Sequence, residues 1–312
     1  MRLLKQFSYF RNINMSDHCR YWLLYGLMLL CMFFVSNTAQ ATALQKSITS
    51  PDHPLVVESE IIKFLTDNFV QLPEKLITIN NNATVYAQYA QPTTRYRHGI
   101  LGDSIEAEQL VVVRDRIAYT HTVSDKYVFE DIKPRLFDVD NDGELEIITV
   151  RTHVTKGAGI MIYKIIDNVL AEFAWVEEIG LANRWLNIVA SYDLDSDGTV
   201  ELAWIQTPHI GGVLKVANIK AGKLEVLSEL SGYSNHSIGE RNLCLSMVTK
   251  TKNTIVFYVP TQDRRQIAGF SFSDNTIQKI ENINQPTNFS YPLASQYDFT
   301  DVVLEGGFCT GL

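Results

Sequence analysis

Two copies of one acidic pattern carry residue types that can bind a metal ion. Each copy reads Asp-x-Asp-x-Asp-Gly-x-x-Glu, at 138–146 and 193–201, and runs into a short apolar segment. Calcium prefers six to eight oxygen ligands in a flexible cage. Carboxylates at alternate positions can converge on one ion, and the glycine allows a sharp turn beneath it. The pattern therefore predicts two calcium sites.

The predicted ligands are the carboxylates of each copy and the backbone carbonyl at its seventh position. In the first copy they are Asp138, Asp140, Asp142, Glu144 and Glu146. In the second they are Asp193, Asp195, Asp197, Thr199 and Glu201. An EF-hand would need a glutamate at position twelve, where this chain has Thr149 and Trp204. The other alternative is a pair of metal-free surface turns, in which the clustered carboxylates would repel one another.

The elements that must position these loops are predicted to be short strands. The β-like runs between polar turns are Val85–Ala90, Gln109–Val113, Arg116–Thr122, Glu146–Val150, Ile160–Ile165, Val200–Gln206, Val213–Ile219, Ile255–Val259 and Ile267–Phe272. Many short strands indicate a sandwich, barrel or propeller, and a repeat of about 50 residues favours propeller blades. A third unit keeps the strands but has no acid in its loop, Thr249–Thr254, so no calcium is expected there.

Four further phrases accompany the acidic loops. They are Thr94–Asp103, Asn183–Asn187, Thr207–Gly212 and Ser234–Gly239. Over roughly residues 84–275 the chain resembles FG-GAP/VCBS-type repeats, the integrin-α-like calcium-loop β-propeller blades of secreted bacterial proteins. The resemblance implies an all-β propeller with calcium in both intact loops. The length at about 50 residues per four-stranded blade gives about five to six blades, against seven in integrin-type propellers.

The N-terminal residues 1–41 have the character of a signal peptide. A basic start precedes the apolar run Tyr21–Val35, and small-x-small cleavage sites follow it. An uncleaved membrane anchor is the alternative, although a span needs about 20 residues and this run is shorter. Translation from Met15 is a second open point. Residues 42–83 are expected to form a lead segment with at most one helix, and 84–312 the propeller.

Charge and cysteine content agree with export to the periplasm or the medium. The chain has a net charge of −8, and removal of an N-terminal segment of net charge +3 would make it −11. This balance argues against nucleic acid as a partner, because phosphate binding needs a basic surface. Only Cys244 and Cys309 would remain, either as one disulfide or as two buried thiols. No membrane span is expected after cleavage.

No catalytic signature of the GxSxG, HExxH, P-loop or dinucleotide-binding type occurs in the sequence. Because propeller turns gather around a channel, residues from several turns can form a ligand pocket. The candidates are Asn183, Arg184, Trp185, His209, His236 and Arg241, with His98 and His153 as further acid–base groups. The alternatives are histidines that hydrogen-bond backbone in turns, a core Trp185, and an Arg184 that caps a strand edge.

The sequence predicts an exported calcium-binding β-propeller that acts as a binding or scaffold module rather than as an enzyme. Calcium would be structural, and the partner an unidentified protein or glycan. The alternative is a polysaccharide-active hydrolase or lyase on a propeller scaffold, which would need paired carboxylates that here are better explained as calcium ligands.

Overall fold

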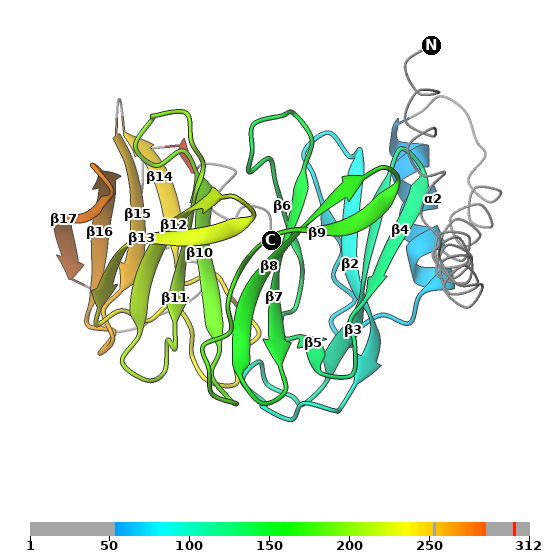
Figure 1. Cartoon of the computed structure of the whole chain (residues 1–312), viewed down its shortest axis with the longest axis horizontal. Coiled ribbons are helices and arrows are strands. Elements are labelled where there is room, and N and C mark those ends of the chain that lie inside the picture. Colours follow the sequence, from blue (N-terminus) through cyan, green and yellow to red (C-terminus); the bar gives the residue numbers. More distant parts are fainter. Residues whose placement is uncertain (1–53, 252–253, 285–301, 304–312) are drawn as a thin grey trace, which may run out of the picture. The chain divides into compact units, whose positions relative to one another are not determined.

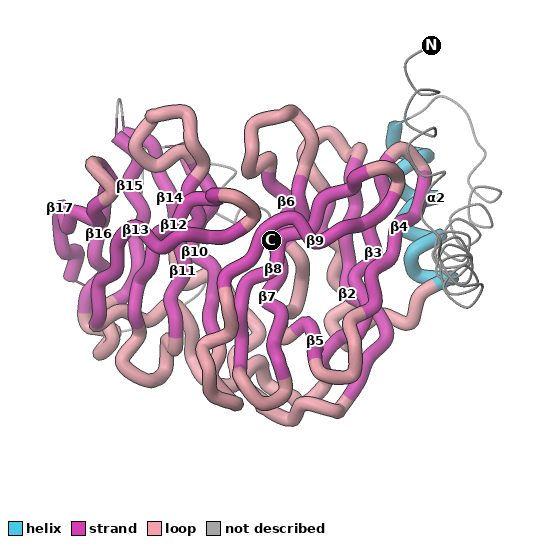
Figure 2. The backbone as a smooth tube through the Cα atoms, in the orientation of Figure 1, coloured by secondary structure: helices cyan, strands magenta, loops and turns pink. Residues whose placement is uncertain are grey.

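The computed structural model describes residues 54–251, 254–284 and 302–303, all within one compact unit, Ser50–Leu312. The predicted signal peptide at 1–41 and Cys309 lie outside the described residues. Within these ranges the chain is mostly strand, with a single helix, as Figure 2 shows. In the described part of the chain, no helix combines the length and hydrophobicity needed to cross a membrane.

The helix, α2 (Pro54–Asn68), lies in the lead segment where helical spacing of apolar residues occurs. Ile61, Phe64 and Leu65 follow the i, i+3, i+4 spacing of one helix face and are buried. The Leu65 carbonyl accepts a hydrogen bond from the Gln88 side chain at 3.5 Å, so the helix packs against the first long strand.

The strands fall into four successive antiparallel units (Figure 1). The first consists of β2 (Val85–Thr93), β3 (Glu106–Arg114) and β4 (Ile117–Thr122), with β1 (Thr78–Ile79) on the edge of β2. The second consists of β6 (Arg135–Phe137), β7 (Glu146–His153), β8 (Gly157–Ile166) and β9 (Val169–Val176), with β5 (Tyr127–Phe129) paired to the end of β7.

The third and fourth units are four-stranded meanders. The third consists of β10 (Leu186–Tyr192), β11 (Glu201–Gln206), β12 (Val213–Lys220) and β13 (Lys223–Ser231). The fourth consists of β14 (Met247–Thr251), β15 (Thr254–Pro260), β16 (Gln266–Ser273) and β17 (Thr276–Asn284), with β18 (Val302–Val303) on β14. Every run predicted from the sequence overlaps one strand and exceeds it by no more than one residue, so the mostly-β prediction is confirmed.

Strand pairing between units is sparse. One antiparallel pair, Ala107 with Phe129, joins β3 to β5, and one parallel pair, Lys223 with Trp175, joins β13 to β9. The fourth unit forms a separate sheet. Among the described strands the sheets do not close into a ring, and four units are present there where five to six blades were expected.

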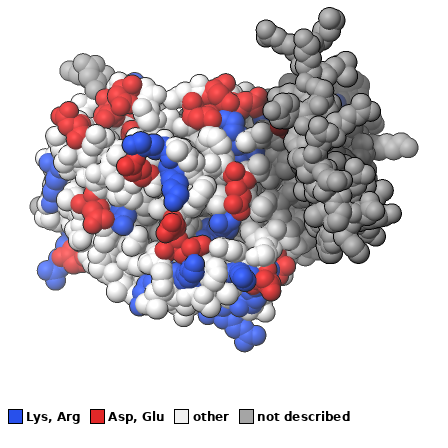
Figure 3. Space-filling view, viewed as in Figure 1, with Lys and Arg blue, Asp and Glu red and all other residues white. Residues whose placement is uncertain are grey.

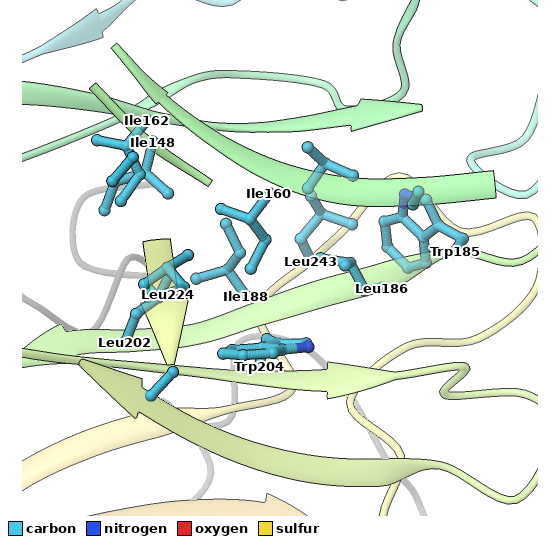
Figure 4. Close-up of a cluster of buried hydrophobic side chains, with 14 of the residues drawn as sticks. Ile148, Ile160, Ile162, Trp185, Leu186, Ile188, Leu202, Trp204, Leu224 and Leu243 are labelled. Atoms are coloured by element: carbon cyan, nitrogen blue, oxygen red, sulfur yellow. The ribbon is translucent and has the colours of Figure 1, made fainter. Parts of the chain in front are cut away.

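Side-chain packing, rather than strand pairing, joins the sheets of consecutive units. Three buried clusters lie between the first and second, the second and third, and the third and fourth units. The middle cluster in Figure 4 brings Ile148 and Ile160 of the second unit against Trp204 and Leu202 of the third, with Trp185 at one side. Face-to-face burial of this kind is the arrangement that supports stacked small sheets.

Because strand direction alternates, the connections fall into two sets at opposite strand ends. The acidic-loop end holds the β6–β7 and β10–β11 loops, 138–145 and 193–200 (Figure 1). The histidine end holds the connections 94–105, 177–185, 207–212 and 232–246, which carry His98, His209 and His236.

Candidate metal centre and histidine cluster

The two acidic loops share one internal hydrogen-bond pattern. The first carboxylate of each loop, Asp138 or Asp193, accepts hydrogen bonds from the backbone N–H groups of the fifth and sixth positions at 2.8–3.2 Å. The closing glutamate, Glu146 or Glu201, accepts from the N–H of the second position at 2.8 Å in both loops. The repeat therefore extends from sequence to atomic geometry.

Backbone conformation explains the residue types at the fourth and sixth positions of the two acidic loops. The sixth position is Gly143 in one loop and Gly198 in the other, with φ of 88° and 89°. The fourth position, Asn141 or Ser196, also has positive φ, at 57° and 63°. Left-handed φ is accessible to glycine and is tolerated by asparagine, so the loop can turn back on itself.

Carboxylate oxygens converge in both loops. Asp138, Asp140 and Glu146 each place one oxygen within 4.8 Å of the others, and so do Asp193, Asp195 and Asp197. Two oxygens across a calcium ion at 2.3–2.6 Å are about 5 Å apart, so both donor sets fit a hard cation. Asp142 and Glu201 lie outside these two sets. The side chain of Glu144 forms an ion pair with Arg114.

The first loop differs from the second in one cation that the sequence analysis missed. The ammonium of Lys164, on β8, lies 2.6 Å from Asp140, 2.8 Å from Asp142 and 2.8 Å from Glu146. Its side chain is 11% exposed. Burial alone would lower the pKa of Lys164, but the hydrogen bonds to these three carboxylates raise it.

The pKa values of both closing glutamates are raised above the ordinary value for a glutamate. Burial raises the pKa of Glu146 to about 7, although Lys164 and the Val139 amide oppose the shift. Burial, together with repulsion from the three aspartates of its loop, raises the pKa of Glu201 to about 8. Lys164 forms salt bridges with three carboxylates of the first loop, whereas among the described residues no Lys or Arg forms a salt bridge with a carboxylate of the second.

The two loops are also connected to each other. The Asn141 side chain donates a hydrogen bond to the Gly198 carbonyl at 3.0 Å. A cavity of about 660 Å³ lies between them, and Asp138, Asn141, Asp193 and Ser196 are among its lining residues. The loops therefore form one acidic edge rather than two separate turns.

At the histidine end, three of the predicted ligand-binding residues meet. The ring of Trp185 lies parallel to that of His209 at 6.3 Å and 4.8 Å from that of His236, and the two histidine rings are 5.1 Å apart. Trp185 and His236 are buried, whereas His209 is half-buried. Trp185 therefore belongs to the core, as one sequence alternative held, and supports the two histidines.

Hydrogen bonds fix the proton positions in this pair. The Nε2 of His236 lies 2.7 Å from the Glu240 carbonyl, which can only accept, so this nitrogen carries the proton. The Nδ1 of His236 must then accept from the Nε2 of His209, at 3.1 Å. Burial lowers the pKa of both imidazoles to about 4, so both are neutral at pH 7. The Nδ1 of His209 is left as an acceptor.

The remaining candidates have other partners. The backbone N–H of Asn183 donates to the Tyr96 hydroxyl at 2.7 Å, and the Arg184 side chain donates to the backbone carbonyl of Asn183 at 3.0 Å. Arg241 forms ion pairs with Asp103 and Glu74. These contacts tie the turns to one another, and among the described residues none joins Arg241 to the two histidines.

Glu130 is a central residue that the sequence gave no reason to select. Its buried carboxylate lies 2.6 Å from the Nδ1 of His98 and accepts from the Thr152 hydroxyl at 2.7 Å. Its carbonyl accepts from the Trp185 indole at 2.9 Å. Burial raises the pKa of Glu130, although His98 opposes the shift. Glu130 stands outside any motif, so only the three-dimensional contacts reveal it.

Cys244 is disulfide-bonded. The other three cysteines lie outside the described residues. Of the two alternatives left by the sequence for Cys244, the structure therefore has the disulfide rather than a free thiol.

Comparison with known proteins gives fold-level similarity only. No protein-family model and no curated protein sequence matches this chain. A rhamnogalacturonan lyase from Bacillus licheniformis matches over 56% of this chain and 42% of its own, with 13% identity and a TM-score of 0.35. A protein from Lactobacillus plantarum matches over 69% and 57%, with 12% identity and a TM-score of 0.41. An exotype rhamnogalacturonan lyase matches over 65% and 48%, with 11% identity and a TM-score of 0.40.

These similarities to β-propeller proteins are distant. The chain spans 42–57% of the length of these three structures. At such scores and coverage the similarities assign no activity, substrate or partner to it.

Proposed function

We propose that this chain is an exported, calcium-binding module of propeller type, in which calcium is structural and the histidine end supplies the binding surface. One observation carries the proposal: two loops 55 residues apart repeat the same hydrogen bonds and bring carboxylate oxygens together at calcium-compatible spacing. A cation at either loop would neutralise clustered carboxylates and fix the connection between two core strands.

The four antiparallel units are the proposed blades. Each is built around a three- or four-stranded meander, and neighbouring units share a buried cluster but have few paired strand residues between them. The loop before β7 and the loop before β11 lie at the same strand ends, so a calcium ion in either loop would fix the acidic-loop end of its blade.

Exposed aliphatic side chains support a binding role for the opposite end. Leu181, Ile210 and Ile238 are 56%, 59% and 70% exposed. Each lies within four residues, along the sequence, of a member of the cluster formed by Trp185, His209 and His236. A protein or glycan is the proposed partner class. Figure 3 shows acidic and basic side chains interspersed on the face drawn, which with the negative net charge disfavours nucleic acid.

Calcium dependence of thermal stability tests the proposal. Saturating calcium at about 100 times its Kd should stabilise the folded chain by about 2.7 kcal/mol, and a chelator should remove that gain. Asp195→Asn should reduce the calcium-induced rise in Tm, whereas Asp125→Asn, an exposed carboxylate in another turn, should not. A Tm that calcium leaves unchanged in the unmodified chain would reject a structural calcium site.

A polysaccharide-active hydrolase or lyase is the second candidate, and the buried acid–base groups of the histidine end favour it. His98 with Glu130, and His209 with its acceptor Nδ1, supply groups that can move protons. Activity on a panel of polysaccharides that is lost in His209→Ala, but kept in Asp195→Asn at saturating calcium, would establish the enzyme. Absence of such activity, with a glycan or protein ligand found by binding screens, would establish the module.

Export is proposed from residues 1–41. N-terminal sequencing of the mature protein tests it: a new terminus shortly after Ala41 or Ala43 is expected, and an intact N-terminus would indicate an anchor.

A further inference from the structure

The register of β7 and β8 places one side chain of β8 against the closing acid of the first loop. Ile147 pairs with Tyr163, and continuing this register by one residue places Glu146 opposite Lys164, whose ammonium lies 2.8 Å from the Glu146 carboxylate. Paired residues project from the same face of a sheet. The Lys164 side chain therefore runs under the loop, and its ammonium reaches three carboxylates at 2.6–2.8 Å.

These carboxylates include two of the three whose oxygens converge. Asp140 and Glu146 belong to the candidate ligand set of the first loop, and both contact the ammonium. The Lys164 side chain is 11% exposed, and the side chain of its partner Glu146 is fully buried. A divalent ion that uses these oxygens must first displace a desolvated ammonium from them, which costs free energy.

The second loop has a different residue at the equivalent place. Glu201 pairs with Asn218 on β12, the position that corresponds to Lys164 on β8 when the β7–β8 register is continued by one residue. Asparagine is shorter and neutral, so it brings no charge to the loop. Its amide oxygen is buried and has no hydrogen-bond partner among the described residues. An amide oxygen is a calcium ligand type, whereas an ammonium excludes a cation.

We propose that the Lys164 ammonium takes the place of the ion in the first loop, so that the chain binds one calcium ion, at the second loop, with Asn218 on its inner side. This inference rests on the proposed calcium function. Lys164 and Asn218 are then the residues that decide which copy of the repeat takes metal, while the acidic motif itself is the same in both.

Calcium stoichiometry in reciprocal variants tests the inference, by isothermal titration with calcium alone on the purified chain. The unmodified chain should bind one ion. Lys164→Asn should bind two, Asn218→Lys should lose at least tenfold in affinity, and the double swap should bind one. Lys63→Asn, the same substitution on exposed α2, should remain at one. Near-UV circular dichroism checks folding, and Lys164→Gln gives a second neutral variant that keeps more of the side-chain length.

The outcomes separate this inference from the function on which it rests. Two ions in the unmodified chain, or one ion in both folded Lys164 variants, would overturn the inference and leave the calcium function intact. No ion in the unmodified chain and none in the folded Lys164 variants would overturn both. One ion that Asp140→Asn abolishes, rather than Asp195→Asn, would place the metal in the first loop and overturn the inference.

Discussion

The two ends of the strands are stabilised by opposite means. The centre of the histidine end, formed by Trp185, His209 and His236, holds neutral groups: Trp185 and His236 are almost inaccessible, and both imidazoles are neutral at pH 7. The acidic-loop end gathers charges in exposed turns around the closing glutamates Glu146 and Glu201. Packing therefore controls stability at the first end, and charge balance controls it at the second.

The largest effect should come from removing the indole at the histidine end. Trp185→Ala deletes a buried ring and leaves the Glu130 carbonyl without its donor, so we expect unfolding free energy to fall by about 3–5 kcal/mol. Trp175→Ala, at a half-buried tryptophan, is the matched control and should cost less. Urea denaturation with and without calcium measures both. If added calcium restored the unfolding free energy that Trp185→Ala loses, stability at the histidine end would not depend on packing alone, and the contrast between the two ends would be wrong.

Acid should weaken the histidine end. The pKa of His236 is lowered to about 4 in the folded chain, below its ordinary 6.5, so the unfolded chain binds the proton more readily between these values. Stability is thus full above pH 6.5 and falls as pH drops to about 4, by at most about 3 kcal/mol for this group. His209 adds a change of the same sign.

Urea titrations in a chelator at several pH values measure this dependence. His236→Asn should flatten the profile between pH 6.5 and 4, while His153→Asn, at a histidine outside the cluster, should not. If His236→Asn retains the full slope, neutrality of the buried imidazole is not what stabilises this end.

The contrast between the ends also explains what the sequence could predict. The acidic loops can be predicted from the sequence because metal ligands need fixed residue types at fixed spacing. One motif, present twice, therefore gives ten candidate ligands. Strands with continuous apolar runs, such as β8 and β15, were equally evident. The polar outer strand β13 was missed, because its exposed, partly buried and buried residues follow one another without a clear period.

Contacts between turns that are distant in the chain could not be predicted from the sequence. Glu130 precedes β6 and His98 follows β2, and only the packing of two units brings them within 2.6 Å. Lys164 was missed for a similar reason: its role depends on strand register, which places it opposite Glu146. A single lysine in an apolar strand carries no local signal of that role.

Within the acidic-loop end, loss of charge at the two closing glutamates should differ in size when metal is chelated. The pKa of Glu201 is raised to about 8 and that of Glu146 to about 7, so the fold disfavours the ionised form of each, and a neutral glutamine should stabilise. Glu201→Gln should gain about 1 kcal/mol, because its loop has no salt bridge among the described residues. Glu146→Gln should gain less, because it also removes a partner of Lys164. Urea denaturation in a chelator at pH 7 measures both, and equal gains would show that Lys164 does not balance the first loop.

The smallest effect should distinguish the fourth positions of the two loops. Asn141→Gly keeps the positive φ accessible but removes the hydrogen bond to the Gly198 carbonyl, so we expect a loss of about 0.5 kcal/mol. Ser196→Gly, at the equivalent place, removes no hydrogen bond among the described residues and relieves a left-handed φ of 63°, so a gain of about 0.5 kcal/mol is expected. Paired urea denaturation in a chelator resolves the difference of about 1 kcal/mol between the variants. Equal effects would mean that the Asn141 bridge contributes nothing, and that the two loops differ only through the charges beneath them.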